Sequence, residues 1–397
     1  MSLNTDRSYK MKLRDVENAF KYRRIPYPKR SVELIALLAI SCTFFLFMHT
    51  NKLNSRLKEM EVKLQPSEFS ALGLTGNHIS GHDAGKHDDI NTLHGTYQYL
   101  KSTGQLVNVT TLRQNNTRRA RRRVVFFNRP TRVGTELMLP LLSLLSKHND
   151  VNLVLKGPVR KKSLMRTAKQ ERIETRFVSR LENGSLYVAH GNWIDFAEYN
   201  RRKPIYISLV RDPVERMLDN YYQQRTLKKQ IISRNIYPAY PQHPDAWYKQ
   251  SFSECVRRAS PECQYIEYSM RDEVEDFKRQ SLFFCGNDID CLPFNTRYGV
   301  QKAKRNVEKE YSVVGTWEQP NITLTVLEKY VPRYFNHALT LFNLHKQSYS
   351  TFRRYAVDAD VWAMVRRNFS REYDFYNFCK QRLYKQYLAL KLEKSLN

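Results

Sequence analysis

Short runs of β-branched and aromatic residues alternate with helical patterns from residue 124 onward, and this alternation is the strongest constraint on the fold. The runs have the length of buried strands, and helix-length segments separate most of them. They cover residues 124–128, 151–157, 185–190, 204–210 and 311–317. Strands that alternate with helices predict an α/β fold, in which helices flank both faces of a central, largely parallel sheet.

Four helical patterns accompany these strands, and they cover residues 135–147, 214–225, 322–330 and 361–390. In the last pattern, large apolar side chains recur at spacings of 3, 4 and 7, so we expect one long helix there. Pro140 interrupts the first pattern. A proline at that depth kinks a helix or resets its start, because it has no N–H to donate and crowds the preceding turn.

The uncharged run Leu34–Met48 precedes the alternating region. With its flanks it is near the lower limit for a membrane span, and a buried core helix and a signal-peptide core are the alternatives. The first thirty residues carry nine Lys and Arg against three acids, which favours a cytosolic N-terminus. We therefore predict a cytoplasmic tail at 1–30 and a transmembrane signal-anchor at 31–50, in a thin early-secretory membrane.

Residues 51–123 are predicted to be a lumenal stem, and residues 124–397 the folded domain. Glycines and histidines are concentrated in the middle of the stem, as in a solvated linker, and metal binding by these histidines is the weaker alternative. A run of arginines at 118–123 marks the boundary. It fits a charged edge before the first strand, and Arg119–Arg122 also resembles a furin-type cleavage sequence.

Two features agree with a lumenal location. Asn-X-Ser/Thr glycosylation sites follow the span at Asn108, Asn115, Asn183, Asn321 and Asn368. Cys255 and Cys263 are eight residues apart and Cys285 and Cys291 are six apart, which in an oxidising compartment predicts two local disulfides. A four-cysteine zinc site is the alternative, although its cysteines usually stand closer together.

The formal net charge is +27, from 66 Lys and Arg against 39 Asp and Glu. A charge of this size predicts an acidic partner, which is a nucleic acid, an anionic lipid or an acidic polysaccharide. A lumenal location disfavours nucleic acid and favours an acidic glycan.

Polar residues follow three of the expected strands, at the edge where open parallel sheets bind ligands. The first such segment, from Asn128 to Thr135, places basic residues, a glycine and a hydroxyl between a strand and a helix. Backbone N–H groups of such a loop and the helix N-terminus would hold a phosphate. The Walker A spacing is absent, and an ordinary strand–helix loop is the alternative.

The other two segments supply an arginine and a histidine. One strand ends at Arg211, and the next residues fit a helix start, with Asp212 as N-cap, Pro213 as first helical residue and Glu215 in a capping box. An arginine beside a helix N-terminus suits a second phosphate. The other strand ends at His190. A lone histidine is more often structural, but at the ligand edge of such a fold it is a candidate general base.

Together these residues resemble the Golgi carbohydrate sulfotransferases, and among them the uronyl and heparan sulfate 2-O-sulfotransferases. The resemblance extends from residue 124 to the C-terminus and rests on five stretches: FFNR with the following glycine, YVAHGNWIDFAEY, PIYISLVRDPVER, the FSEC…C…FFCG…C pattern and YSVVGTWE. It implies a P-loop-like sulfotransferase fold, a Golgi membrane location, sulfate transfer from the nucleotide donor PAPS without a metal, and a homo-oligomer such as a trimer.

The resemblance also implies roles for individual residues. His190 falls on the family's catalytic base, whereas a second family histidine is Val188 here. Arg132 replaces the lysine that faces the sulfuryl group, and Asp219 replaces a serine that helps to bind the 3′-phosphate. The donor site would comprise Arg132, Val133, Gly134, Thr135, Arg211 and Asp219, and the acceptor site Arg129 and Asn192.

Three departures from the family pattern bear on activity. Arg132 stays charged at any useful pH, so it can stabilise a departing anion but is a poor proton donor. Glu136 and Asp219 place carboxylates near a polyanionic donor, and like charge weakens binding unless each carboxylate is paired or turned away. Arg216 and Arg225 are candidate partners for Asp219.

We expect a type II membrane enzyme in which His190 removes the proton from a sugar hydroxyl, by resemblance the 2-OH of a uronic acid. The basic triplet at 201–203 is expected to line the groove for the acidic glycan. One alternative is a sulfotransferase-like glycan-binding protein without turnover. Another is a metal-dependent glycosyltransferase, because Asp288–Asp290 and Asp358–Asp360 match the Asp-x-Asp pattern.

Overall fold

The structure is a computed structural model. It describes residues 91–121, 123–157, 165–227, 243–270, 278–345 and 355–396, together with residues 41, 43, 48, 49, 231 and 235. The predicted cytoplasmic tail, almost all of the predicted span and the first part of the predicted stem lie outside the described residues. None of the helices in the described ranges has the length and apolar character that a membrane span needs.

A five-stranded sheet forms the centre of the domain, and every neighbouring pair of strands is parallel. The strand order is β2-β3-β1-β4-β5. The strands are β1 (Val125–Asn128), β2 (Asn152–Leu155), β3 (Ser185–Ala189), β4 (Ile205–Val210) and β5 (Tyr311–Thr316). Each strand falls within one of the five predicted runs, so the predicted α/β class with a parallel sheet is confirmed.

The first two crossover helices lie on opposite faces of the sheet. α6 (Thr135–His148) connects β1 to β2, and α7 (Ala168–Arg180) connects β2 back to β3. These connections run in opposite directions along the sheet, and right-handed crossovers therefore place their helices on opposite faces. The core on the α7 side is largely aromatic, because the Phe126 ring stacks on Tyr206 and lies 5.1 Å from the Tyr187 ring.

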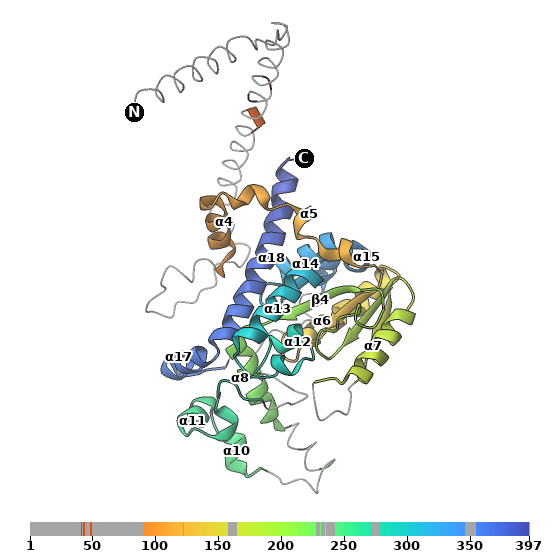
Figure 1. Ribbon diagram of the computed structural model, residues 1–397. Helices are drawn as coiled ribbons and strands as arrows, with labels where there is room; N and C mark the ends of the chain where they lie inside the picture. Colours follow the sequence, from red (N-terminus) through yellow and green to blue (C-terminus); the bar gives the residue numbers. More distant parts are fainter. Residues whose placement is uncertain are drawn as a thin grey trace, which may run out of the picture. The chain divides into compact units, whose positions relative to one another are not determined.

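Three helices pack around the β5 side of the sheet (Figure 1). They are α13 (Arg297–Glu310), α14 (Pro320–Tyr330) and α18 (Ser370–Leu396). The predicted single helix at 361–390 is wrong, since α17 (Ala359–Asn368) ends before α18 begins. The break falls at Phe369, whose buried ring packs 5.0 Å from the rings of both Tyr265 and Phe294. Burial of this ring outweighs helix continuity at that residue.

α8 (Pro213–Gln224) follows β4 and supports the site described below. Shorter elements complete the described chain. They are α4 (Leu93–Ser102), η2 (Gln105–Asn108), α5 (Thr111–Gln114), η3 (Asn116–Arg119), α10 (Asp245–Lys249), α11 (Phe252–Arg257), η4 (Pro261–Cys263), α12 (Leu282–Cys285), η5 (Ile289–Cys291), α15 (Pro332–Phe335) and α16 (Ala338–Leu344), with η denoting 3-10 helices.

Both disulfides that the cysteine spacing predicts are present. Cys255–Cys263 joins α11 to η4, and Cys285–Cys291 closes a short loop after α12. Four of the five glycosylation sites are exposed. The exception is Asn115, a half-buried residue whose side chain accepts a hydrogen bond from the N–H of Thr117 at 2.9 Å.

Candidate active site

Three strand ends meet at the carboxyl edge of the sheet. β1 lies between β3 and β4, with Asn128 opposite Ala189 and Phe127 opposite Ile207. The residues that follow these strands therefore share one edge, as the sequence predicts. The Ser208 hydroxyl donates a hydrogen bond to the Asn128 carbonyl at 2.8 Å, which links β4 to the end of β1.

The loop after β1 turns tightly into α6. Arg132 and Gly134 both have left-handed backbones, with φ of 60° and 95°, and Val133 between them is fully buried. A left-handed arginine is uncommon, because a Cβ crowds the backbone there. α6 begins at Thr135 as predicted and continues through Pro140 without a reset of its start. The side chains of residues 135–137 lie outside what the structure describes, so the effect of Glu136 stays a prediction.

Arg216 fastens this loop to α8. Its guanidinium is fully buried, and Nε donates to the Thr131 carbonyl at 2.7 Å while Nη2 donates to the Thr131 hydroxyl at 3.2 Å. Nη1 of Arg211 donates to the Arg132 carbonyl at 3.3 Å. Two arginines from the β4–α8 segment thus hold the β1 loop by its carbonyls. Sequence reasoning missed this role of Arg216.

The start of α8 has the predicted N-cap, Asp212, but not the predicted capping box. The Asp212 N–H donates to Glu318 at 2.9 Å, and the Glu215 carboxylate faces Arg211 instead. The Asp212 carboxylate accepts the N–H groups of Val214 at 2.9 Å and Glu215 at 3.0 Å, and the Tyr373 hydroxyl at 2.8 Å. Pro213 is the first helical residue. Burial raises the pKa of Asp212, and the nearby Glu318 carboxylate raises it further, although these donors oppose the shift. Tyr373 comes from α18, so the C-terminal helix anchors the helix start at the ligand edge.

Arg211 is held on both its backbone and its side chain. Gln280 accepts the Arg211 N–H at 2.9 Å and donates to its carbonyl at 3.0 Å. The guanidinium is only 1% exposed and faces two carboxylates of α8, Glu215 at 3.7 Å and Asp219 at 3.6 Å. No local sequence signal could have identified Gln280, which stands 69 residues from Arg211.

The predicted partners of Asp219 need correction. Arg211 is the cation that pairs with Asp219, because its side chain runs along the first two turns of α8. Arg216 binds Thr131, as described above, and Arg225 pairs with Glu262 at 2.5 Å. Arg211 is therefore a site residue already shared with two acids.

His190 is half-buried beside the end of β1. Its Nδ1 lies 2.9 Å from the Arg129 carbonyl oxygen, and its ring centroid lies 5.4 Å from that of Phe283. A carbonyl accepts hydrogen bonds only, so Nδ1 carries the proton in this contact and Nε2 is the basic nitrogen. The backbone of Arg129, rather than its predicted acceptor-binding side chain, makes this contact with the imidazole.

Arg166 supports the turn that carries His190. Its Nη2 donates to the His190 carbonyl at 3.0 Å, and the guanidinium packs so closely on Gly191 that an added Cβ would overlap it. Asn287, inside the Cys285–Cys291 loop, accepts the Arg166 N–H at 3.0 Å and the Asn192 amide at 3.1 Å. Asn192, a predicted acceptor-binding residue, is buried, and its amide nitrogen donates to Asn287.

A buried carboxylate completes this support. Glu174 of α7 accepts the Tyr187 hydroxyl at 2.6 Å, pairs with Lys156, and lies 3.8 Å from Arg166. Burial raises the pKa of Glu174, but the charge of Arg166 and the bonds from Lys156 and Tyr187 lower it more, so the pKa is lowered overall. Glu174 therefore remains ionised and holds Arg166 in place by charge.

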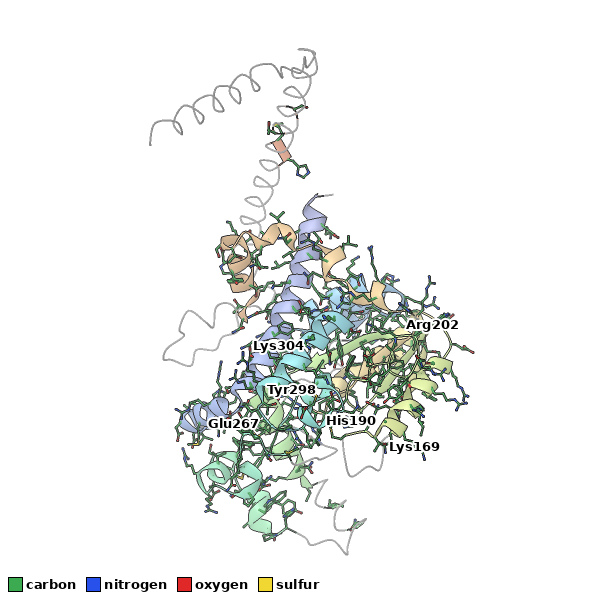
Figure 2. The ribbon with its side chains drawn as sticks, viewed as in Figure 1. Lys169, His190, Arg202, Glu267, Tyr298 and Lys304 are labelled. Carbon is green, nitrogen blue, oxygen red and sulfur yellow. A yellow bond between two sulfur atoms is a disulfide. The ribbon has the colours of Figure 1, made fainter. Side chains whose placement is uncertain are left out.

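The basic triplet at 201–203 does not lie where the sequence suggested. It precedes β4, and the Arg121 N–H donates to the Lys203 carbonyl at 3.0 Å just before β1. The triplet is therefore at the amino edge of the sheet, and His190 is at the carboxyl edge (Figure 2). A six-residue strand separates these edges by about 20 Å. Closeness in sequence misled here, because the segment after β3 returns to the opposite edge before β4 begins.

Three of the four aspartates in the two Asp-x-Asp matches pair with cations. Lys302 contacts Asp288, and Arg257 pairs with Asp358 at 2.5 Å and Asp360 at 3.0 Å. Within the described ranges, no group of three or more His, Cys, Asp and Glu side chains is arranged to hold a metal ion.

Comparison with known proteins agrees with this arrangement. A profile of the Sulfotransferase family matches residues 115–379. The chain belongs to the Sulfotransferase family. It is 44% identical to the Drosophila melanogaster protein named uronyl 2-sulfotransferase homolog pip, over 98% of this chain and 95% of that protein. It is 25% identical to uronyl 2-sulfotransferase of Mus musculus, over 67% of this chain and 64% of that one, and 28% identical to human heparan sulfate 2-O-sulfotransferase 1, over 49% and 51%.

Proposed function

We propose that this chain is a Golgi type II membrane enzyme that transfers a sulfuryl group from PAPS to a hydroxyl of an acidic glycan. The preferred acceptor position is the 2-OH of a uronic acid, as the names of the relatives suggest. The observation that carries the proposal is His190, which lies at the meeting point of three strand ends with Nδ1 bound to a carbonyl.

A doubly phosphorylated nucleotide suits two parts of this edge. The tight β1 loop delivers the chain into the N-terminus of the 14-residue helix α6, where unpaired N–H groups favour an anion. Arg132 adds a permanent positive charge to that loop, and Arg211 supplies a second cation beside the start of α8. The two carboxylates at Arg211 oppose an anion there, and they are considered again below.

In the proposed reaction, His190 Nε2 accepts the proton of the sugar hydroxyl. The hydroxyl oxygen forms a bond to sulfur while the bond from sulfur to the bridging phosphate oxygen breaks, and the phosphate leaves with the electron pair. Arg132 and the N–H groups at the start of α6 stabilise the charge that develops on that oxygen. Such a reaction depends mainly on position and preorganised charge.

The test incubates the full-length chain with radiolabelled PAPS and a panel of glycosaminoglycans. We expect label in chains that contain uronic acid, and we expect His190→Ala to lower kcat by about 10²- to 10⁴-fold. His345→Ala, which removes an exposed histidine of the α16 terminus, is the matched control. Full sulfate transfer by His190→Ala would exclude the proposed role of the imidazole.

One observation favours a second candidate function, a glycan-binding protein without turnover. Arg211, the expected 3′-phosphate ligand, already faces Asp219 and Glu215. Calorimetric titration with the desulfated donor product separates the two candidates. Micromolar binding supports the enzyme, and no detectable binding supports the second candidate.

A further inference from the structure

We propose that the outer face of α7 is a second binding surface for the acidic glycan, outside the catalytic site. The surface, which we name the α7 ridge, consists of Lys169, Arg172, Arg176 and Arg180. These residues recur every three or four positions, so they lie along one side of the helix. All four are exposed, and none of them forms an ion pair with another residue that the structure describes.

The acidic residues of α7 are withdrawn from this face. Glu171 accepts the Tyr199 hydroxyl and the Asn287 amide, and Glu174 is buried against Tyr187, Arg166 and Lys156. The nearest exposed acid in the sequence, Glu182, follows the end of the helix. The helix therefore presents cations to solvent, whereas Glu171 and Glu174 contact Asn287 and Arg166, the residues that support the turn at His190.

This arrangement does not favour helix stability. Arg172, Arg176 and Arg180 stand four residues apart, and like charges at that spacing destabilise a helix. Two large apolar side chains, Ile173 and Phe177, are 61% and 46% exposed on the same helix. A stretch of unpaired cations with exposed apolar area is better explained by a bound polyanion than by the needs of the fold.

The ridge leads away from the catalytic site. In Figure 2, Lys169 and His190 lie toward the same end of the sheet, and Arg202 lies toward the other end. The ridge covers about 16 Å along the helix axis, because Lys169 and Arg180 are 11 positions apart and each position adds about 1.5 Å. It runs toward the amino edge, where the basic triplet at 201–203 lies. A linear polyanion fits this path, whereas a small anion or a lipid headgroup would use only one end of it.

The identity of the polyanion rests on the proposed function, which supplies an acidic glycan as acceptor. A chain with one sugar at His190 must be long to reach Arg180. The ridge would therefore act on long chains and have no effect on short ones. This length dependence can be measured as binding without donor, so loss of the proposed sulfate transfer would leave the test intact.

The test compares two variants of the full-length chain with equal net charge. The ridge variant carries Lys169→Gln, Arg172→Gln, Arg176→Gln and Arg180→Gln. The control variant carries Lys329→Gln, Arg367→Gln, Arg371→Gln and Lys394→Gln, which replace exposed cations of α14, α17 and α18. Glutamine is a good helix former, so we expect both variants to fold.

Binding of a heparin tetrasaccharide and of full-length heparin is measured over a range of salt concentrations. For full-length heparin we expect the ridge variant to raise the Kd about 10- to 100-fold at low salt, and to reduce the slope of log K against log salt by about three. We expect no change for the tetrasaccharide, and little change for the control variant with either ligand.

Three results would overturn the proposal. The first is an equal loss of heparin binding in the ridge and control variants, which would mean that only net charge matters. The second is an equal loss for the tetrasaccharide and the long chain, which would place the cations in the catalytic site. The third is a ridge-dependent loss for a DNA duplex with none for heparin. With PAPS present, the ridge variant should raise KM for long acceptors and leave kcat unchanged.

Discussion

Replacement of Arg166 by methionine removes a support of His190 without touching the imidazole. The side chain donates to the His190 carbonyl at 3.0 Å and lies 3.8 Å from the Glu174 carboxylate, and both Arg166 and Glu174 are buried. Methionine keeps most of the length and apolar contact of the arginine. The substitution therefore isolates the charged hydrogen bond that fixes the turn after β3.

The expected effect follows from that hydrogen bond. A hydrogen bond from a charged donor contributes about 1.5 to 3 kcal/mol. If this energy holds the imidazole in place, its loss lowers kcat by about 10- to 100-fold, since about 1.4 kcal/mol corresponds to one factor of ten. Glu174 keeps Lys156 and Tyr187 as partners, so we expect the Tm to fall by only about 2 to 8 °C.

Initial rates with saturating PAPS and glycan, together with thermal unfolding, test this prediction. We expect kcat to fall while the KM for PAPS changes by less than about threefold, because the proposed donor loops do not include Arg166. Arg166→Lys restores charge beside Glu174 but not the planar fork, so we expect it to recover the Tm more than kcat. A purely structural role predicts a lower Tm with normal kcat per folded molecule, and that result would refute the reasoning.

Three further substitutions probe the same edge. Because the pKa of Glu174 lies below its ordinary value of 4.5, the ionised carboxylate stabilises the fold above pH 4.5 and loses this effect as pH falls through the folded pKa. In Glu174→Gln, the free energy of unfolding measured in urea should therefore fall less steeply as the pH is lowered below 4.5. An unchanged pH dependence would contradict the assignment. Asp219→Ser removes one carboxylate from Arg211, so calorimetry should show about tenfold tighter binding of the desulfated donor product. Weaker binding would mean that the Asp219 carboxylate does not repel the phosphate. Gly191→Ala forces the Arg166 guanidinium to move, so kcat should fall at least about tenfold; normal kcat would show that the turn tolerates a side chain.

The parts of the site that local pattern determines could be predicted from the sequence. A buried strand followed by a cap and a proline fixes both the strand end at Val210 and the start of α8. Strand–helix alternation then brings His190, Arg132 and Arg211 to one edge, because the carboxyl ends of parallel strands coincide there. Cysteine spacing predicted both disulfides for a similarly local reason.

The supports of these residues could not be predicted, because they come from distant segments. Gln280 holds Arg211 from 69 residues away, and Asn287 holds Arg166 from 121 residues away. α7 was missed as a helix because Glu174 and Thr175 are buried while Ile173 and Phe177 are exposed, which blurs the apolar pattern. α13 was missed because few of its residues are large and apolar. A capping box at Thr167 and Gln170 was the one readable signal of α7.

The two candidate functions differ in what happens to Arg211 when a donor arrives. The guanidinium is 1% exposed, so a phosphate can reach it only after its neighbours move. The Asp219 and Glu215 side chains are 19% and 28% exposed, and both stand more than 3.5 Å from the arginine nitrogens. Neither pair is close enough for a hydrogen bond and both carboxylates are partly exposed, so a phosphate dianion, with its greater charge, can compete for the arginine. We therefore propose that these carboxylates are displaced from Arg211 when the second phosphate of the donor binds there. If Asp219→Ser strengthens binding of the desulfated product and raises the rate of sulfate transfer, the carboxylates tune an active enzyme; if it strengthens binding without transfer, the loss of turnover lies at Arg132 or His190 instead.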